Sequence, residues 1–518
     1  MKGVVQSHFA EVPRANIPRS VFDRSHTRKQ TMEAAGYLYP IMVDEVLPGD
    51  THIVHLDAFC RLATPIVPLM DNLYLDTFFF FVPNRLVWDN WPKFMGEQRN
   101  PGDSIDYTVP TTTSISGYTS LGLADYMGIP VGVPNLEHNV LPLRAYNLIW
   151  NEWFRDQNLQ QRAVENKDDG PDTATDYGPL QRGKRHDYFT SCLPWPQKGD
   201  AVSLPLGTKA YVSVDAAVAA NPTVQRPATG NFHYLDSGAA QVDISGTTDA
   251  TEANKLYADL SNATATTINQ IRQAFQIQKL QERDARGGTR YTELIRAHFG
   301  VVSPDQRLQR PEYLGGGSTP MNITQVAQTS STDATTPKGD LSAYVTANVM
   351  GNGFAKSFTE HGYILGLAMV RADITYQKGL PRMFSRSTRY DFYLPALAHI
   401  GEQAVLRKEI FAVDEVANPG DNDIVFGYQE RFGEHRYYPS EICGKFRSDA
   451  TGSLDFWHLS QDFSVAPTLG DTFIKETPPL DRAIAVTGEP HLIFDGHFRQ
   501  KSVRPMPMFG VPGFVDRF

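Results

Sequence analysis

Residues 73–82 read LYLDTFFFFV, and this apolar stretch determines the class of fold that the sequence predicts. Aromatic and β-branched residues favour strands, and a strand with large apolar side chains on both faces must be covered on both faces. The phenylalanine run therefore predicts an internal strand of a sandwich or a strand that a neighbouring subunit buries. Two tryptophans follow within ten residues, and the candidate inter-subunit residues are Phe78, Phe80, Trp88 and Trp91.

Short segments of similar composition lie on both sides of this stretch and end near Gly, Pro or Asp, as strands commonly do. They are residues 51–60, 363–375, 390–397, 424–428 and 483–486. No regular helices separate these segments, so a parallel sheet built from βαβ units is not expected. The sequence predicts a mainly β fold.

Helices are predicted in the connections between strands. Residues 145–161 place their large apolar side chains near one face, with Asn and Gln elsewhere. Residues 268–286 begin behind Thr267, which forms a capping-box pattern with Gln270, and they stop before a Gly-Gly pair. Residues 291–299 are a third, shorter candidate.

The chain has 518 residues, of which 41% are hydrophobic and 20% are charged, and this composition is typical of globular proteins. Cys60, Cys192 and Cys443 are widely separated and form no CxxC pair, which argues against a disulfide framework and against a cysteine-based zinc site. No apolar run reaches the roughly 18 residues of a membrane-spanning helix, and the N-terminus lacks the apolar core of a secretory signal. We therefore expect a soluble protein made in a cytoplasm, with no membrane partner.

Charge is distributed unevenly along the chain. The whole chain has 48 Lys and Arg against 58 Asp and Glu, a net charge of −10. Residues 1–30 have six basic residues against two acidic ones, 6 − 2 = +4, and the basic ones are Lys2, Arg14, Arg19, Arg24, Arg28 and Lys29. Basic arms on acidic proteins commonly contact nucleic acid or a partner chain. We expect residues 1–40 to form an extended basic arm, interior or inter-subunit, and the alternative is a solvated tail.

Two polar segments interrupt the apolar pattern. Residues 221–250 and 325–353 are dominated by Thr, Ala, Gly, Asp and Asn, so neither can bury enough apolar surface to form a core. We expect an outward insertion over residues 221–266 and a second polar surface loop over residues 325–353.

The C-terminal tail shows the opposite pattern, because Pro alternates with apolar residues from Pro505 to Phe514. An extended apolar tail is not expected to remain in water, so it lies on its own subunit or on another chain. Its candidate contact residues are Met506, Met508, Phe509 and Phe514.

The common signatures of enzymes are absent from the sequence. It contains no GxxxxGK[ST] phosphate loop, no GxSxG nucleophile elbow and no HExxH zinc helix. The 14 histidines are dispersed, and neighbours such as Glu360 and His361 would point to opposite sides of a strand, which is the wrong geometry for joint metal ligation. We predict no catalytic residues, no metal ligands and no cofactors.

Several long sequence words resemble those of one family. They are residues 7–24 (SHFAEVPRANIPRSVFDR), 44–51 (DEVLPGDT), 79–85 (FFFVPNR), 282–291 (ERDARGGTRY), 308–315 (LQRPEYLG), 357–363 (SFTEHGY) and 426–431 (FGYQER). In this order they are similar to the major capsid protein of gokushoviruses, the tailless single-stranded DNA phages within the microviruses. The resemblance covers nearly the whole chain except about residues 221–265 and 325–353, where no family pattern is recognised.

The resemblance implies an eight-stranded antiparallel viral jelly roll with long loop insertions that contain a few helices. It implies one capsid domain over residues 41–518, in the shell of a small icosahedral virion, with one insertion rising as a protrusion at the threefold axes. The implied partners are copies of the chain itself, packaged single-stranded DNA, a small internal DNA-binding phage protein and a bacterial surface receptor. Such a protein is assembled in the host bacterial cytoplasm and becomes part of the virion. We expect host attachment at the insertion, with candidate residues Asn221, Asn231, Tyr234 and Asp243.

A second class of function fits the same fold. Jelly rolls with exposed aromatics and long loops also bind or cleave carbohydrates, although the sequence singles out no pair of carboxylates for cleavage. The basic first 30 residues favour the capsid. Purified particles of uniform diameter would support the capsid, whereas a monomer that binds to a glycan column would support the alternative.

Overall fold

The computed structural model describes residues 18–200, 202, 211–213, 223–225, 232–237, 242–248, 257–259, 268–302, 308–330, 332 and 337–509. The chain forms two compact units, of which the first comprises Met1–Pro196 and Phe299–Phe518 and the second comprises Gln197–His298. Within the described ranges, no helix has both the length and the apolar character needed to span a membrane.

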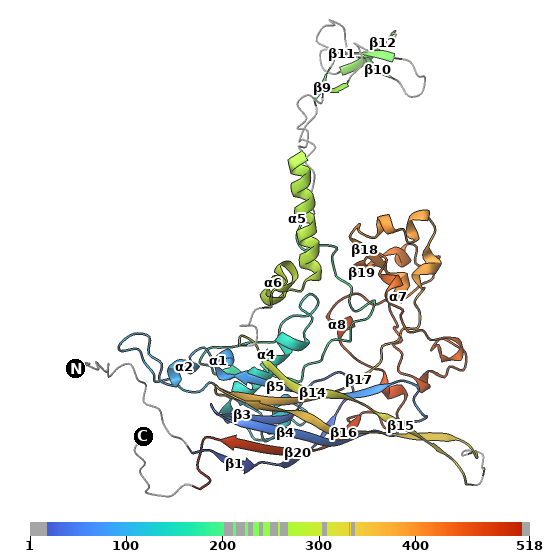
Figure 1. The fold of residues 1–518 in the computed structure, drawn as a ribbon. Helices are drawn as coiled ribbons and strands as arrows, with labels where there is room; N and C mark the ends of the chain where they lie inside the picture. Colours follow the sequence, from blue (N-terminus) through green and yellow to red (C-terminus); the bar gives the residue numbers. More distant parts are fainter. Residues whose placement is uncertain are drawn as a thin grey trace. The chain divides into compact units, whose positions relative to one another are not determined.

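A six-stranded antiparallel sheet forms one layer of the first unit (Figure 1). Its strands are β1 (Ser20–Asp23), β2 (His26–Met32), β4 (Thr51–Leu62), β15 (Asn322–Ala327), β16 (Leu341–Ser357) and β20 (Leu492–Arg504). They pair in the order β1-β20-β4-β16-β15, and β2 pairs with β20 next to β1. The N-terminal and C-terminal strands of the chain are therefore neighbours.

A four-stranded antiparallel sheet forms the facing layer. Its strands are β3 (Tyr39–Val46), β5 (Leu73–Pro83), β14 (Glu312–Pro320) and β17 (Gly362–Ala372), paired in the order β14-β5-β17-β3. Only Met321 separates β14 from β15, so one extended segment passes from this sheet to the six-stranded sheet.

The main core lies between the two sheets. Successive side chains of a strand point to opposite faces of its sheet, and the inward ones on β4 and β20 are mostly apolar or small. Leu56, Phe494 and Phe498 are fully buried there and share one apolar cluster with Phe79 of β5 and Ile364 of β17.

Short helices cover the outer face of the four-stranded sheet. They are α1 (Asn84–Val87), α2 (Trp91–Phe94), α3 (Leu123–Met127) and α4 (Leu141–Ile149), and the last continues into a π-helical turn, Trp150–Phe154. Their side chains form a second apolar cluster with β5 and β17, in which Phe80 and Trp88 are fully buried. As a result, every residue of β17 is buried. Three further short strands lie in this connection: β6 (Thr111–Ser114), β7 (Leu136–Asn139) and β8 (Asp172–Thr173).

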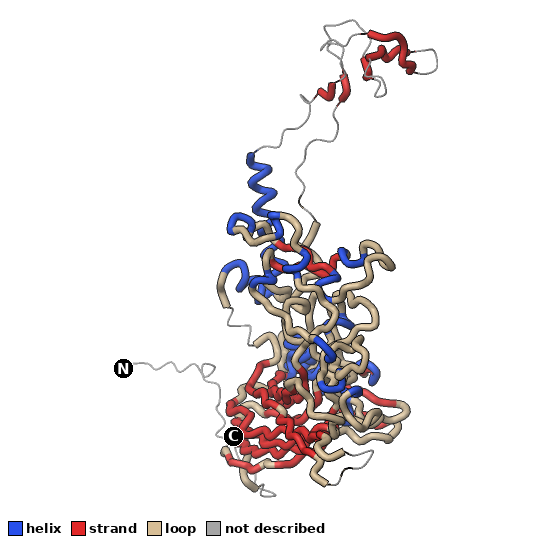
Figure 2. Tube along the Cα trace, turned by 90° about the vertical axis from the view of Figure 1, so that its right-hand side faces the viewer, coloured by secondary structure: helices blue, strands red, loops and turns tan. Residues whose placement is uncertain are grey.

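Residues 374–474 form a lobe beyond the end of β17, and Figure 2 shows that loops predominate outside the sandwich. The lobe contains β18 (Glu402–Leu406), α7 (Arg407–Ile410), β19 (Val425–Glu430) and α8 (Asp471–Ile474). A third apolar cluster stabilises it and includes Tyr188, Phe189 and Tyr376.

The second unit contains β9 (Tyr211–Ser213), β10 (Thr223–Gln225), β11 (Phe232–Ser237), β12 (Val242–Thr248), β13 (Tyr257–Asp259), α5 (Ile268–Arg286) and most of α6 (Tyr291–Phe299). The strands β10, β11 and β12 form one antiparallel sheet, and β9 pairs with β13. Of the nineteen residues of α5, only Ala285 is buried within the described part of the chain.

The mainly β prediction is confirmed, and so are the strands predicted at residues 51–60, 73–82, 363–375 and 424–428 and the helices at 268–286 and 291–299. The helix predicted at 145–161 begins earlier, at Leu141, and ends at Phe154. Two predicted strands are wrong. Residues 390–397 fall in two 3-10 turns, Arg389–Asp391 and Pro395–Leu397, and in the link between them. Residues 483–486 contribute only one isolated bridge, from Ile484 to Pro65. Aromatic composition misled the first of these predictions, because Tyr390, Phe392 and Tyr393 are exposed.

Three boundaries also need correction. Residues 20–32 of the predicted arm are strands of the six-stranded sheet, because their backbone pairs along β20. The predicted loop at 325–353 is largely the hairpin of β15 and β16, since small inward residues such as Ala343 and Ala347 alternate with polar outward ones. The second unit is wider than the predicted insertion at 221–266, because it also contains α5 and most of α6.

Candidate nucleic-acid interface

No element among the described residues of the first unit covers the outward face of the six-stranded sheet. Strand alternation places charged and aromatic side chains on this face while their neighbours enter the core. Its exposed residues on β2, β4 and β20 include Lys29, Phe59, Arg61, Asp495, His497, Arg499 and Lys501, and the half-buried Asp57 lies among them. We call this surface the open face.

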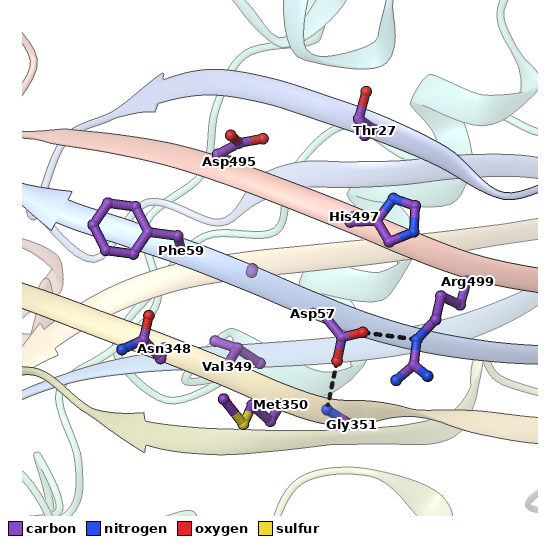
Figure 3. Close-up of a pocket in the computed structure, with 11 residues that line it drawn as sticks. Thr27, Asp57, Phe59, Asn348, Val349, Met350, Gly351, Asp495, His497 and Arg499 are labelled. Atoms are coloured by element: carbon purple, nitrogen blue, oxygen red, sulfur yellow. Dashed lines mark hydrogen bonds and ion pairs between the residues drawn. The ribbon is translucent and has the colours of Figure 1, made fainter.

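A shallow hollow of about 760 Å³ lies on the open face (Figure 3). Phe59 is 45% exposed and lies opposite Asp495, while His497 lies opposite Asp57 on the same pair of strands. A β-bulge between Val349 and Asn352 shapes the wall that β16 contributes.

Two contacts order the floor of the hollow. Arg499 Nε lies 2.7 Å from Asp57 Oδ2, and the backbone N–H of Gly351 donates to Asp57 Oδ1 at 3.3 Å (Figure 3). Lys29 Nζ is 3.8 Å from Asp495 Oδ2, whereas Arg61 makes no ion pair with any described residue. On one surface, an exposed phenyl ring can stack an unpaired base while guanidinium groups contact phosphates of the same strand.

The basic residues predicted for nucleic-acid contact fall into two groups, those at the surface and those bound within the subunit. Lys29 is on the open face, and Arg19 is exposed near the backbone of Gly49. Arg24 instead donates two hydrogen bonds to the Asp44 carboxylate, at 2.6 and 2.8 Å, and Arg28 donates to the backbone oxygen of Tyr126. We therefore assign Arg24 and Arg28 to subunit structure. Lys2 and Arg14 lie outside the described residues.

A buried polar network below the open face links β20 to residues that lie next to the N-terminal strands. Asp44 accepts hydrogen bonds from Arg24 and, at 2.6 Å, from Gln500 of β20. His52 is fully buried between Asp44 and Asp50, and burial lowers the pKa of its imidazole below the ordinary value. These contacts all join described residues of the subunit, so we assign the network to subunit structure, and Asp50 Oδ1 is buried without a hydrogen-bond partner among those residues.

The apolar candidates for inter-subunit contact also separate into two groups. Phe80 and Trp88 are fully buried in the subunit itself, so the prediction that they meet a neighbouring subunit is wrong. Phe78 packs edge-on against Phe154 at 5.2 Å between ring centroids, and Trp91 packs against Trp88 at 6.1 Å. The four residues serve the contact between the sheet and its helical cover.

The tail and insertion candidates have the following positions. Phe509 is 82% exposed, and Met506 and Met508 are also exposed, so the described part of the chain leaves them uncovered. Tyr234 lies on β11 opposite Ser245, and Asp243 lies on β12 opposite Asp236. Phe514, Asn221 and Asn231 lie outside the described residues.

Sequence reasoning missed Phe59, Arg61, Arg499 and Lys501 as a surface. The signal was available in the alternation of residues 51–62, THIVHLDAFCRL, and of residues 492–504, LIFDGHFRQKSVR. No group of metal-ligating side chains occurs among the residues that the structure describes.

Comparison with known proteins identifies the family. A family model described as "Capsid protein (F protein)" matches residues 10–514. The chain is 49% identical to capsid protein VP1 of Bdellovibrio phage phiMH2K, with 99% of this chain and 98% of that protein covered. It is 41% identical to capsid protein VP1 of Chlamydia phage 1 (99% and 98% covered) and 37% identical to that of Spiroplasma virus 4 (96% and 96% covered). The chain therefore belongs to the VP1 capsid proteins of gokushovirus-type microviruses, small single-stranded DNA phages, and is a structural component of the virion rather than an enzyme.

Proposed function

We propose that this capsid protein forms an icosahedral shell in which a jelly roll turns the open face toward the packaged single-stranded DNA. The sandwich supports the jelly roll, because two antiparallel sheets face each other and the successive strands β3, β4 and β5 alternate between them. The observation that supports the DNA contact is the exposed Phe59 with Arg61 and Arg499 on an uncovered sheet.

The anchoring of the insertion supports this orientation. Before the insertion, Leu193 exchanges backbone hydrogen bonds with Tyr428 of β19, both at 2.8 Å. After it, the guanidinium of Arg310 lies 4.1 Å from the ring centroid of Trp153, beside the helical cover. The strand β19 and the helical cover lie on the side of the sandwich away from the six-stranded sheet (Figure 1). We propose that the side of the first unit that holds these two anchors faces outward in the shell, so that the open face turns inward.

The helix α5 supports contacts between copies of the insertion. An isolated helix of this length is marginal in water, and most helical stability in proteins comes from packing of an apolar face. Ile268 is 69% exposed and Phe275 is 67% exposed, and Leu280 is also exposed. Copies of α5 that meet at a threefold axis would bury these side chains and support the protrusion.

Ultraviolet crosslinking of intact particles tests the orientation. Peptides 51–62 and 492–504 should be recovered covalently attached to nucleotides, because they contain the open face. Crosslinks confined to the lobe or to the helical cover would contradict the proposal. The small internal DNA-binding phage protein would compete for the same surface, so recombinant shells that lack it are the matched comparison.

Host attachment is the proposed role of residues 221–266, through a bacterial surface receptor. Many copies on one shell convert weak individual contacts into strong avidity. Replacement of residues 225–262 by a short Gly-Ser linker should preserve particles and abolish adsorption to host cells. Normal adsorption would place recognition elsewhere, with residues 328–340 between β15 and β16 as the next segment to replace.

A further inference from the structure

The lobe contains a cavity of about 600 Å³ to which the shell function assigns no role. Buried Tyr188 and Tyr376 line it, and exposed Phe384, Tyr437 and Tyr438 line its rim. Tyr438 is 81% exposed. Exposed aromatic side chains around the mouth of a cavity are typical of an interaction site.

Hydrogen-bond donors line the same cavity. Arg382 Nη1 donates to Glu409 Oε1 at 2.8 Å, and Arg386 Nη2 donates to Glu434 Oε1 at 3.3 Å. The Nε atom of Arg386 is buried and has no hydrogen-bond partner among the described residues. The cavity thus combines aromatic side chains with guanidinium donors, one of which is unsatisfied.

We propose that this cavity binds residues 505–514 of a second copy of the chain. These residues read PMPMFGVPGF, and their three prolines have no backbone N–H to donate. Pro-rich segments adopt an extended conformation with exposed carbonyl acceptors, and aromatic-lined grooves commonly bind them. Phe509 and Met508 are exposed in their own subunit and supply the apolar side chains that such a groove would bury.

The length of the tail places it on a second copy. Arg504 ends β20 next to Thr51, at the end of the sandwich where β17 begins with Gly362. The lobe begins beyond Ala372, at the other end of β17, and an eleven-residue strand spans roughly 36 Å. Ten residues of Pro-rich chain span only about 31 Å. The tail therefore cannot pass along its own sandwich and also occupy the cavity of its own lobe.

This inference rests on the proposed assembly, and the first experiment tests it without assembly. A fluorescent peptide of residues 503–516 is titrated onto the unassembled full-length chain, and its anisotropy is measured. We expect saturable binding that Tyr438→Ala weakens at least tenfold and that Tyr344→Ala, at an exposed tyrosine of β16, leaves unchanged. A scrambled peptide of the same composition should not bind. Absence of binding, or equal binding by the Tyr438→Ala chain, overturns the proposal.

The second experiment distinguishes two copies from one. Cys443 is exposed and follows Ile442 of the cavity wall, whereas Cys60 and Cys192 are buried. In particles of a Met508→Cys chain, diamide should oxidise two thiols to a disulfide that links different chains, and Cys443→Ser should abolish that link. Particles that form normally but show links within one chain, or no link, would refute tail docking and leave the shell function intact.

Discussion

The strands β17 and β20 lie in facing sheets of one sandwich, yet they are covered differently. Every residue of β17 is buried, because the other sheet covers one face and α1 and α4 cover the other. In β20, buried and exposed residues alternate strictly from Leu492 to Ser502. The chain itself covers both faces of the four-stranded sheet, whereas the described residues leave one face of the six-stranded sheet exposed. We propose that the packaged genome covers this exposed face.

Loss of a phenyl ring from the four-stranded sheet should lower the free energy of unfolding more than any other substitution proposed below. Phe80→Ala removes a fully buried side chain from the second apolar cluster and should lower the free energy of unfolding by about 3 to 5 kcal/mol. Phe59→Ala, on the open face, is the matched control and should cost about 0.5 kcal/mol or less. Urea unfolding of the unassembled subunit measures both. Equal costs would show that the open face is covered within the subunit.

The buried carboxyl of Glu476, at the end of β17 in the four-stranded sheet, should make the stability of the subunit depend on pH. Glu476 Oε1 accepts a hydrogen bond from the backbone N–H of Ala372 at 2.9 Å, and burial raises the pKa of Glu476 to about 7. Because this folded-state pKa exceeds the ordinary value of 4.5, the protonated carboxyl contributes stability that is complete below pH 4.5 and lost as the pH rises to about 7. The full contribution corresponds to about 3 kcal/mol.

Glu476→Gln should remove that dependence, since a neutral amide oxygen can keep the hydrogen bond. At pH 8 the variant should melt at a higher temperature than the parent subunit, and at pH 4.5 the two should nearly coincide. Glu489→Gln, at an exposed position, should leave the pH profile unchanged. A constant difference between parent and variant at every pH would contradict this account.

Removal of two cations from the open face should weaken DNA binding without affecting folding. Arg61→Gln together with Lys501→Gln should reduce the slope of log K against log salt by about 1.4, since each phosphate contact on a single strand contributes about 0.7. Titration of an unassembled subunit with oligo(dT) at several salt concentrations measures the slope. Lys475→Gln, in a lysine paired with Asp471 outside the open face, is the matched control. An unchanged slope would remove both cations from the proposed interface.

Deletion of residues 2–17 should have the smallest effect on the subunit. It removes Lys2 and Arg14 but retains β1, β2 and the Arg24 to Asp44 ion pair, so the free energy of unfolding should change by about 0.5 kcal/mol or less. A deletion that extends to residue 32 also removes the buried Met32 and both edge strands, and it serves as the contrasting control. If the shorter deletion already unfolds the subunit, residues 2–17 are required for folding, and this prediction is wrong.

Local patterns predicted the elements whose signals are local. The phenylalanine run predicted β5, and the cap at Thr267 with the following Gly-Gly pair predicted both ends of α5. The strand β16 was missed because Ala, Thr and Asn resemble a loop, although its inward residues are small enough to pack against β4.

Long-range partners limited prediction of the candidate site. Arg24 and Arg28 looked like phosphate ligands, and only the fold places Asp44 and Tyr126 beside them. The open face joins β2 and β4 to β20, which lies hundreds of residues later in the sequence, so composition near the N-terminus revealed only Lys29 of this surface.

The pairing of β20 with β1, β2 and β4 affects the timing of folding during synthesis. The six-stranded sheet has its last-made strand in an interior position, between β4 and the N-terminal strands. A ribosome must therefore release nearly the whole chain before this layer can close, whereas β3, β5, β14 and β17 are complete earlier. A prematurely terminated chain lacks the strand that joins its own beginning to its middle. Such a product lacks β20, so its six-stranded sheet stays open between β4 and the N-terminal strands.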